Sequence, residues 1–352
     1  MRILYGVVGE GMGHATRSRV VIEHLLDAGH EVEIVVSGRA HDFLLKRLEG
    51  REGVEVHEIH GLHLKYEGNT LDLGRSILSN LGKAPAGLAE NISAYRDLRR
   101  QLRGGREPQV VISDFESWAF YYGLNHFLPV ISIDNMQIIN RCVHPPEIVS
   151  DPSFQLARAA VKVKLPGAYH DLVTTFFYPP LRKERTTLVP PILRPEVQTA
   201  VREPGEHVLV YQTAAANQAL VPMLRTLPYN FRVYGLGREG VEGNVTLRAF
   251  SETGFIDDLR TARAVLAGGG FSLMSECVHL RVPLYSVPID GQYEQELNAR
   301  YLAALGYGAW APAFEREAVA EWLGRVPPLT SYEPKTQADL YAALDGLLAE
   351  VG

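Results

Sequence analysis

The chain has little cysteine, no surplus of positive charge and no long apolar run. Its two cysteines, Cys142 and Cys277, stand far apart among 352 residues, which excludes a disulfide framework and favours a reducing, cytoplasmic environment. The net charge of −6 argues against a nucleic-acid partner, because such proteins usually carry a basic surface. We find no stretch near the roughly 20 apolar residues of a membrane span and no signal-peptide pattern.

Short β-branched runs alternate with helical periods along the whole chain, which predicts an α/β protein with parallel sheets. The first series of strands is expected at residues 3–8, 31–37, 54–59, 110–113 and 129–133, and the second at 207–212, 231–234, 245–249, 265–267 and 284–287. A proline-rich segment separates the two series. We therefore expect two Rossmann-like domains, at 1–195 and 196–332, with a ligand cleft between them and a final helix within 333–352.

The most informative segment is a glycine-rich turn after the expected strand 265–267. Gly268, Gly269 and Gly270 precede Phe271 and Ser272, where a helix is expected to open. Bare glycine backbone lets a phosphate approach the first-turn N–H groups, and the positive end of the helix dipole favours an anion. This pattern predicts a diphosphate site.

Two later features extend the same site. Glu276 lies four residues after Ser272, so both project from one face of the helix and the carboxylate could meet a ribose diol attached to the diphosphate. Glu294 and Gln295 fall at the start of the next expected helix, where their side chains suit sugar hydroxyls. Asn298 follows on that helix.

These motifs resemble the donor-binding half of the GT-B glycosyltransferases, especially the branch of the bacterial peptidoglycan N-acetylglucosaminyl transferase. Glu294-Gln295 followed by Asn298-Ala299 is similar to the Asp-Gln and Asn-Ala of the UDP-glucuronosyl and natural-product transferases. The segment around Ile256, Phe-Ile-Asp-Asp, resembles a turn whose backbone meets the uracil edge. The resemblance implies a UDP-sugar donor and a C-terminal helix that crosses back to the first domain.

The first loop of the chain, after strand 3–8, contains Gly11, Gly13 and His14. A dinucleotide fingerprint needs a glycine where His14 stands, so an NAD role is disfavoured. We instead expect a close backbone turn, with Gly11 and Gly13 among the donor-binding residues, that presents His14 at a helix start. The helix dipole there disfavours imidazolium and leaves the ring able to accept a proton.

A histidine base usually has an orienting carboxylate, and Asp114 is the predicted partner because it follows strand 110–113 and faces the same cleft. Glu116 and Asp134 are reserve candidates. Asp114-Phe115-Glu116 superficially resembles an acid-x-acid metal clamp, but it lies in the half that does not hold the donor. No metal and no cofactor other than the nucleotide-sugar are expected. Asp257 and Asp258 are expected to cap a helix that begins there.

The predicted function is therefore an inverting, metal-independent glycosyltransferase, a hexosyltransferase of GT-B type, acting on an acceptor hydroxyl. A nucleotide-sugar 2-epimerase and a non-catalytic nucleotide-sugar-binding protein are the alternatives. Acceptor contacts are expected from the loops at 62–75 and 137–150. Arginines between 96 and 106, and Lys162 and Lys164 beside an apolar patch at 156–163, suit a solvated face or peripheral contact with an anionic membrane.

Overall fold

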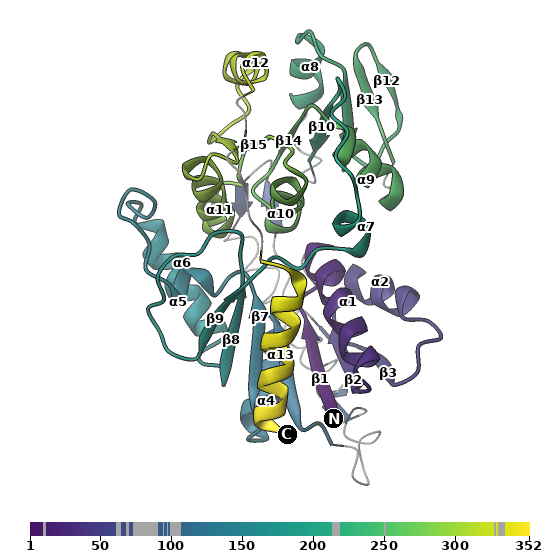
Figure 1. Ribbon diagram of the computed structural model, residues 1–352, viewed down its shortest axis with the longest axis vertical. Coiled ribbons are helices and arrows are strands. Elements are labelled where there is room, and N and C mark those ends of the chain that lie inside the picture. The colour runs from purple at the N-terminus through teal and green to yellow at the C-terminus, as the bar shows by residue number, and fades with distance from the viewer. Residues whose placement is uncertain are drawn as a thin grey trace.

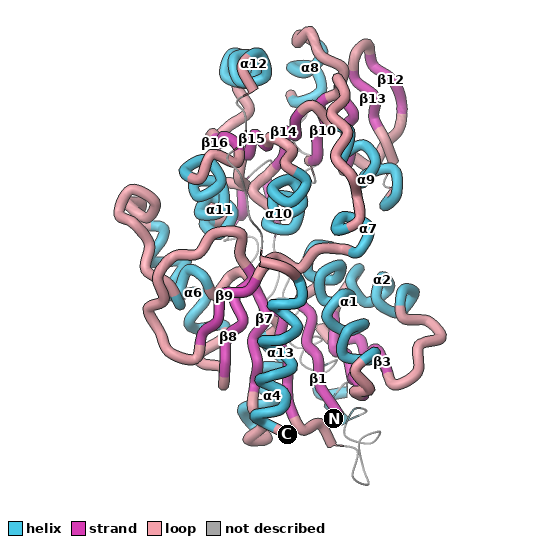
Figure 2. The backbone as a smooth tube through the Cα atoms, viewed as in Figure 1, coloured by secondary structure: helices cyan, strands magenta, loops and turns pink. Residues whose placement is uncertain are grey.

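The computed structural model has two α/β halves, each built on one large sheet with its helices. They lie one above the other in the view of Figures 1 and 2 and are joined through an extended segment. The structure describes residues 1–9, 12–60, 65–67, 70–72, 91–93, 95–96, 98, 107–212, 219–249, 251–326, 329 and 335–352. Gly11, most of the expected acceptor loop at 62–75 and most of the arginine-rich run at 96–106 lie outside these residues. None of the described helices is long and apolar enough to cross a bilayer.

The first sheet has seven parallel strands in the order β3-β2-β1-β6-β7-β8-β9. Its strands are β1 (Arg2–Val7), β2 (Glu31–Val36), β3 (Val54–Glu58), β6 (Val110–Asp114), β7 (Val130–Asp134), β8 (His170–Thr174) and β9 (Thr186–Val189). The order reverses between β1 and β6, and such switch points open a crevice at the carboxyl ends of the strands. Because β1 pairs with β6, the first loop of the chain lies beside the end of β6 at this crevice.

Helices flank this sheet on both faces: α1 (Met12–Asp27), α2 (Arg39–Arg47), α4 (Ser117–Asn125), α5 (Ile138–Arg141) and α6 (Ser153–Lys164). A small antiparallel hairpin, β4 (Lys65–Glu67) with β5 (Thr70–Asp72), lies apart from the sheet. The last helix, α13 (Gln337–Val351), returns to the first sheet and packs beside β8 and β9 (Figure 1). Its leucines, including Leu340 and Leu344, are fully buried in the core that α1 and β1 share.

The second sheet also has seven strands, in the order β12-β13-β11-β10-β14-β15-β16, and β12–β13 is its antiparallel pair. Its strands are β10 (Val208–Tyr211), β11 (Phe231–Tyr234), β12 (Gly240–Glu242), β13 (Val245–Leu247), β14 (Ala264–Ala267), β15 (Leu284–Ser286) and β16 (Gly308–Trp310). The helices are α7 (Pro195–Gln198), α8 (Leu220–Arg225), α9 (Glu252–Thr261), α10 (Phe271–Leu280), α11 (Tyr293–Ala304) and α12 (Arg316–Gly324).

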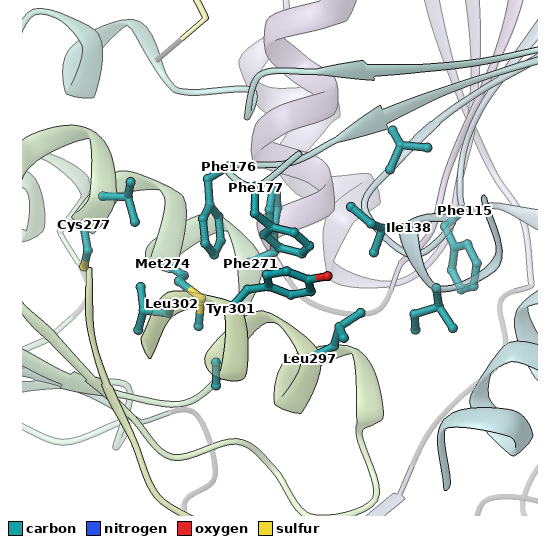
Figure 3. Close-up of a cluster of buried hydrophobic side chains, with 14 of the residues drawn as sticks. Phe115, Ile138, Phe176, Phe177, Phe271, Met274, Cys277, Leu297, Tyr301 and Leu302 are labelled. Carbon is teal, nitrogen blue, oxygen red and sulfur yellow. The ribbon is translucent and has the colours of Figure 1, made fainter. Parts of the chain in front are cut away.

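Aromatic side chains from the two halves pack against one another (Figure 3). Phe177, which follows β8, stacks on Tyr301 of α11 with ring centroids 3.9 Å apart, and Phe176 lies parallel to Phe271 of α10 at 5.9 Å. His144 Nδ1 lies within hydrogen-bonding distance, 2.8 Å, of the Tyr301 hydroxyl. The buried core is therefore continuous from one sheet to the other.

The predicted α/β architecture, with its returning C-terminal helix, is confirmed, whereas several local predictions are wrong. Asp257 and Asp258 do not cap a helix: α9 begins at Glu252 with Ser251 as its cap. Asp258 lies inside α9 and accepts a hydrogen bond from the Tyr234 hydroxyl at 2.7 Å.

Candidate active site

His14 and Asp114 meet at the switch point of the first sheet. α1 begins at Met12, so His14 lies in its first turn, and β1 pairs with β6 so that Val7 is level with Asp114. This register brings the side chains together across 100 residues of sequence: His14 Nδ1 lies 2.9 Å from Asp114 Oδ1. Because a carboxylate only accepts, Nδ1 carries the proton of this bond and the ring's lone pair is on Nε2.

Asp114 is fully surrounded by donors from α1. Arg17 donates from Nε to Oδ2 at 2.8 Å and from Nη2 to Oδ1, and the Ser18 hydroxyl donates to Oδ2 at 2.8 Å. Asp114 is 1% exposed. Although burial raises the pKa of this carboxyl, the Arg17 guanidinium and His14 outweigh burial and hold the pKa well below its usual range. Asp114 therefore stays ionised and fixes the orientation of His14.

The imidazole of His14 is held in its neutral form. Burial, followed by the charge of Arg17, lowers the pKa of His14, and the attraction of Asp114 only partly opposes them. Arg17 Nη2 lies 2.7 Å from Nδ1, so the guanidinium charge is close to the ring and disfavours imidazolium. At neutral pH the ring is therefore able to accept a proton.

The reserve carboxylates have other partners. Glu116 caps α4, accepting from the backbone N–H groups of Trp118 at 2.9 Å and Ala119 at 2.6 Å. Asp134 accepts from the Ser132 hydroxyl at 2.6 Å and from the N–H of Gln137 at 2.8 Å. Burial raises the pKa of Asp134 to about 6. Of the three candidates, Asp114 is the one that contacts His14.

The start of α10 lies against the start of α1. The helix begins at Phe271, one residue before the position expected from the sequence, with Gly270 as its cap. A Cβ atom on Gly13 would lie 2.8 Å from the Ser272 hydroxyl oxygen, so the two helix starts are in close contact at this glycine. The positive ends of both helix dipoles therefore meet in the space between the domains.

Gly269 has a packing role that the sequence did not indicate. Its N–H donates to Gln295 Oε1 at 3.2 Å, and the same oxygen accepts from the N–H of Ile289 at 3.1 Å. A Cβ on Gly269 would lie 2.6 Å from the Cβ of Gln295, so α11 packs directly on this glycine. Gly270 is exposed, and a Cβ there would meet nothing within 4 Å. The predicted ligand contacts of Gly269, Gly270 and Gln295 stay predictions.

Glu276 lies inside α10 and forms an ion pair with Arg194. Arg194 Nε is 2.9 Å from Oε1 and Nη2 is 2.9 Å from Oε2. The role of Arg194 has no signal in the sequence, since nothing in the proline-rich segment indicates that its side chain reaches a helix 82 residues away. The ribose contact predicted for Glu276 remains a prediction.

Glu294, on the first turn of α11, lies close to the charges of the first domain. It accepts a hydrogen bond from Asn298, whose amide also donates to Asn135 Oδ1 at 3.3 Å, across the domain boundary. Burial raises the pKa of Glu294 to about 7, with Asp134 acting in the same direction and Arg17 opposing it. Its predicted role toward the sugar is untested.

Two other predicted donor residues lie in unexpected surroundings. Ile256 is within α9, so the expected backbone turn is wrong: beyond the first turn, its N–H is bonded inside the helix. The Phe271 side chain is 7% exposed and packs on Phe176, which gives it a role in joining the domains. Whether either residue contacts a donor stays a prediction.

Within the described residues, one group of side chains, Glu33, Glu55 and His57, has the ligand types and spacing for a metal ion, with ligand atoms within 4.8 Å of one another. These residues lie on β2 and β3. His57 Nε2 already lies 2.7 Å from Glu33 Oε2, so the pair is satisfied as a hydrogen bond. The group does not include any residue predicted to hold the donor.

The known proteins to which this chain is similar are glycosyltransferases. A family model for glycosyl transferase family 1 matches residues 1–327. An uncharacterized glycosyltransferase of Methanosarcina mazei is 27% identical, over 88% of this chain and 85% of the relative. Another, of Methanosarcina acetivorans, is 26% identical over the same shares.

Solved structures share the fold. MurG of Acinetobacter baumannii matches with a TM-score of 0.53 and 14% identity, over 92% of this chain and 90% of that protein. UGT89C1 of Arabidopsis thaliana, complexed with UDP-L-rhamnose, matches with a TM-score of 0.63 and 15% identity, over 93% and 90%. The GT-B architecture expected from the sequence is confirmed.

The packing of Gly269 leads to a test that uses its neighbour as the control. Gly269→Ala should lower the free energy of unfolding by about 2 kcal/mol, because the new methyl group overlaps the backbone and Cβ of Gln295. Gly270→Ala has open space and an ordinary φ of −62°, so its cost should stay below about 1 kcal/mol. Urea denaturation measures both, and equal stabilities would show that α11 does not depend on Gly269.

Proposed function

The chain belongs to glycosyl transferase family 1, and we propose that it transfers a sugar from a UDP-sugar to an acceptor hydroxyl with inversion and without a metal ion. The observation that carries this proposal is the neutral His14, held by an ionised Asp114 at the mouth of the crevice and next to the start of α10. The proposed base, His14, and the start of α10, which is proposed to bind the diphosphate, come from different domains. This arrangement suits a reaction between an acceptor and a donor.

In the proposed reaction His14 is the general base. Nε2 removes the proton of the acceptor hydroxyl as its oxygen attacks the anomeric carbon, and the bond from that carbon to the nucleoside diphosphate breaks on the opposite face. The electron pair of the broken bond leaves with the diphosphate. The proton stays on His14 as imidazolium, which the carboxylate of Asp114 stabilises through Nδ1.

The donor is proposed to lie along α10 and the start of α11. The N-terminus of α10, at Gly270 and Ser272, would bind the diphosphate, and its dipole offsets negative charge without a divalent ion. Glu276 would accept from the ribose hydroxyls, while Glu294 and Gln295 would contact the sugar. The complex of UGT89C1 with UDP-L-rhamnose supports this donor class, because the two proteins share the fold.

His14→Ala tests the base directly. We expect kcat to fall by about 10²- to 10⁴-fold, the usual contribution of a general base, while the affinity for UDP remains unchanged because α10 holds the nucleotide. UDP release with and without candidate acceptors measures turnover, and calorimetry measures binding.

The same assay separates the alternatives. A 2-epimerase would convert the sugar without accumulating UDP and glycoside, and a binding protein would give no turnover in the wild type. Full activity in His14→Ala would exclude this histidine as the base. Asp114→Asn should also lower kcat, because the amide cannot stabilise the imidazolium as a carboxylate does.

The pH profile should depend on Arg17. Protonated His14 cannot accept a proton, so kcat/KM should fall as the pH drops through the pKa of His14, which lies below its ordinary value. Arg17→Gln removes a charge that lowers this pKa, so the acidic limb should move to higher pH. Arg19→Gln is the matched control, since Arg19 is also on α1 but pairs with Glu23 and Glu196. A limb that stays in place in Arg17→Gln would contradict the assigned electrostatics.

The outer face of α6 supports the proposed peripheral contact with an anionic membrane. Exposed apolar side chains recur along it at helical spacing, at Leu156, Ala159, Ala160 and Val163; the exposed fractions of Leu156 and Val163 are 67% and 74%. The helix carries three cationic residues, Arg158, Lys162 and Lys164, and no carboxylate. Such a helix lies in the interface of an anionic bilayer. This contact would place the enzyme on the cytoplasmic face.

Vesicle sedimentation tests this surface. The wild type should bind vesicles that contain anionic lipid more strongly than neutral ones, and added salt should weaken the binding. The double variant Leu156→Ser, Val163→Ser should lose most of it. Val241→Ser, an equally exposed valine on β12, is the control and should bind as the wild type does. Equal sedimentation of all three proteins would remove the membrane from the proposal.

A further inference from the structure

Arg194 connects the segment between the two sheets to the helix that is proposed to hold the donor. It directly precedes α7, and its guanidinium forms two parallel hydrogen bonds of 2.9 Å with the Glu276 carboxylate. Arg194 is 7% exposed and Glu276 is 6% exposed. Such two-bond pairs fix the plane of the carboxylate as well as its charge.

Glu276 needs this cation because its other surroundings oppose its charge. Burial raises the pKa of Glu276, and the carboxylates of Glu252 on α9 and Glu196 on α7 raise it further. Arg194 is the group that lowers it. On the neighbouring strand β10, Tyr211 is half-buried and carries a phenol whose pKa burial and Glu276 both raise. Tyr211 is therefore neutral and adds no charge.

The pair still leaves Glu276 able to bind a ligand. A carboxylate offers about four lone-pair sites, and the two hydrogen bonds from Arg194 use one on each oxygen. The remaining sites can accept from hydroxyl groups only while the carboxylate is ionised, because protonation converts one oxygen into a donor. The charge state of Glu276 therefore controls how many hydrogen bonds its carboxylate can accept from a bound ligand.

We propose that Arg194 is a positioning residue for the nucleotide, which keeps the Glu276 carboxylate ionised and oriented to accept hydrogen bonds from the ribose of a nucleoside diphosphate. This inference rests on the proposed function, in which Glu276 contacts the ribose. Arg194 itself acts through Glu276.

Arg194 also has a structural contact, which the experiment must separate from the positioning role. Its Nη1 lies 3.7 Å from Glu252 Oε1, and Glu252 is paired in turn with Arg47 of α2 in the first domain. Removal of Arg194 can therefore change stability as well as binding. A change in the pH dependence of binding would not follow from lost stability alone.

UDP binding by calorimetry, from mildly acidic to mildly alkaline pH, tests the inference in the full-length chain. In Arg194→Gln, burial is unopposed and the pKa of Glu276 rises further. UDP affinity should therefore fall by about tenfold or more at neutral pH and recover as the pH rises and the carboxyl ionises. Arg194→Lys keeps the charge without the planar fork, so its affinity should be intermediate and its pH dependence weaker.

Arg202→Gln is the matched control. Arg202 lies in the same joining segment and is also tied into the fold, but its guanidinium donates to the backbone carbonyls of Arg260 at 2.6 Å and Ala262 at 2.5 Å. Its loss should leave UDP affinity and its pH dependence as in the wild type. Thermal melts of each variant confirm that the protein titrated is folded.

The outcomes separate this inference from the proposed donor site. Wild-type affinity in Arg194→Gln, a loss that does not vary with pH, or tighter binding would each overturn the positioning role and leave the donor site intact. Wild-type affinity in Glu276→Gln would show that Glu276 is not a ribose ligand, which overturns that part of the proposed function as well. Absence of UDP binding by the wild type would overturn both.

Discussion

The buried carboxylate of Asp114 is the constraint on which the first domain's half of the site depends. A charge at 1% exposure is stable only when it is paired and fully hydrogen-bonded. Among the described residues, the side-chain donors to Asp114 are His14, Arg17 and Ser18, which come from the first two turns of α1. The end of β6 therefore fixes the position and rotation of α1. The same bonds that satisfy the buried charge also set the tautomer of His14, so stability and chemistry share one group of contacts.

The second domain repeats this principle with different residues. The carboxylate of Glu276 is buried in α10 and is neutralised by an arginine from the joining segment, and Gln295 uses one amide oxygen to hold the backbone of both the glycine turn and the loop before α11. In each half, a buried carboxylate is oriented by an arginine remote in sequence. The starts of α1 and α10 then meet at Gly13, next to Ser272.

The sequence predicted what depends on local pattern and on the general geometry of parallel sheets. Alternating strands and helices are visible as periodicity, and the meeting of His14 with Asp114 follows from the rule that the carboxyl ends of parallel strands share one edge. The roles of Arg17 and Arg194 could not be predicted, because long arginine side chains give no sign of which of many carboxylates they reach. β8 and β9 were missed, since the apolar run of each strand is only two residues long, Leu-Val in both. The error at Asp258 has a similar origin: an acidic pair suits a helix start, but here Arg232 and Tyr234 bind Asp258 from the neighbouring strand.

The position of α13 bears on how the polypeptide matures during translation. The residues of this helix are synthesised after the whole second domain, yet Leu340, Leu344 and Leu348 complete the core beneath α1 and β1. Domains generally acquire their structure in order of synthesis, but the amino-terminal half of this chain cannot complete its core until α13 has been synthesised. The nascent protein therefore carries an uncovered apolar surface while the second domain is synthesised, and transiently exposed apolar surface of this kind favours aggregation.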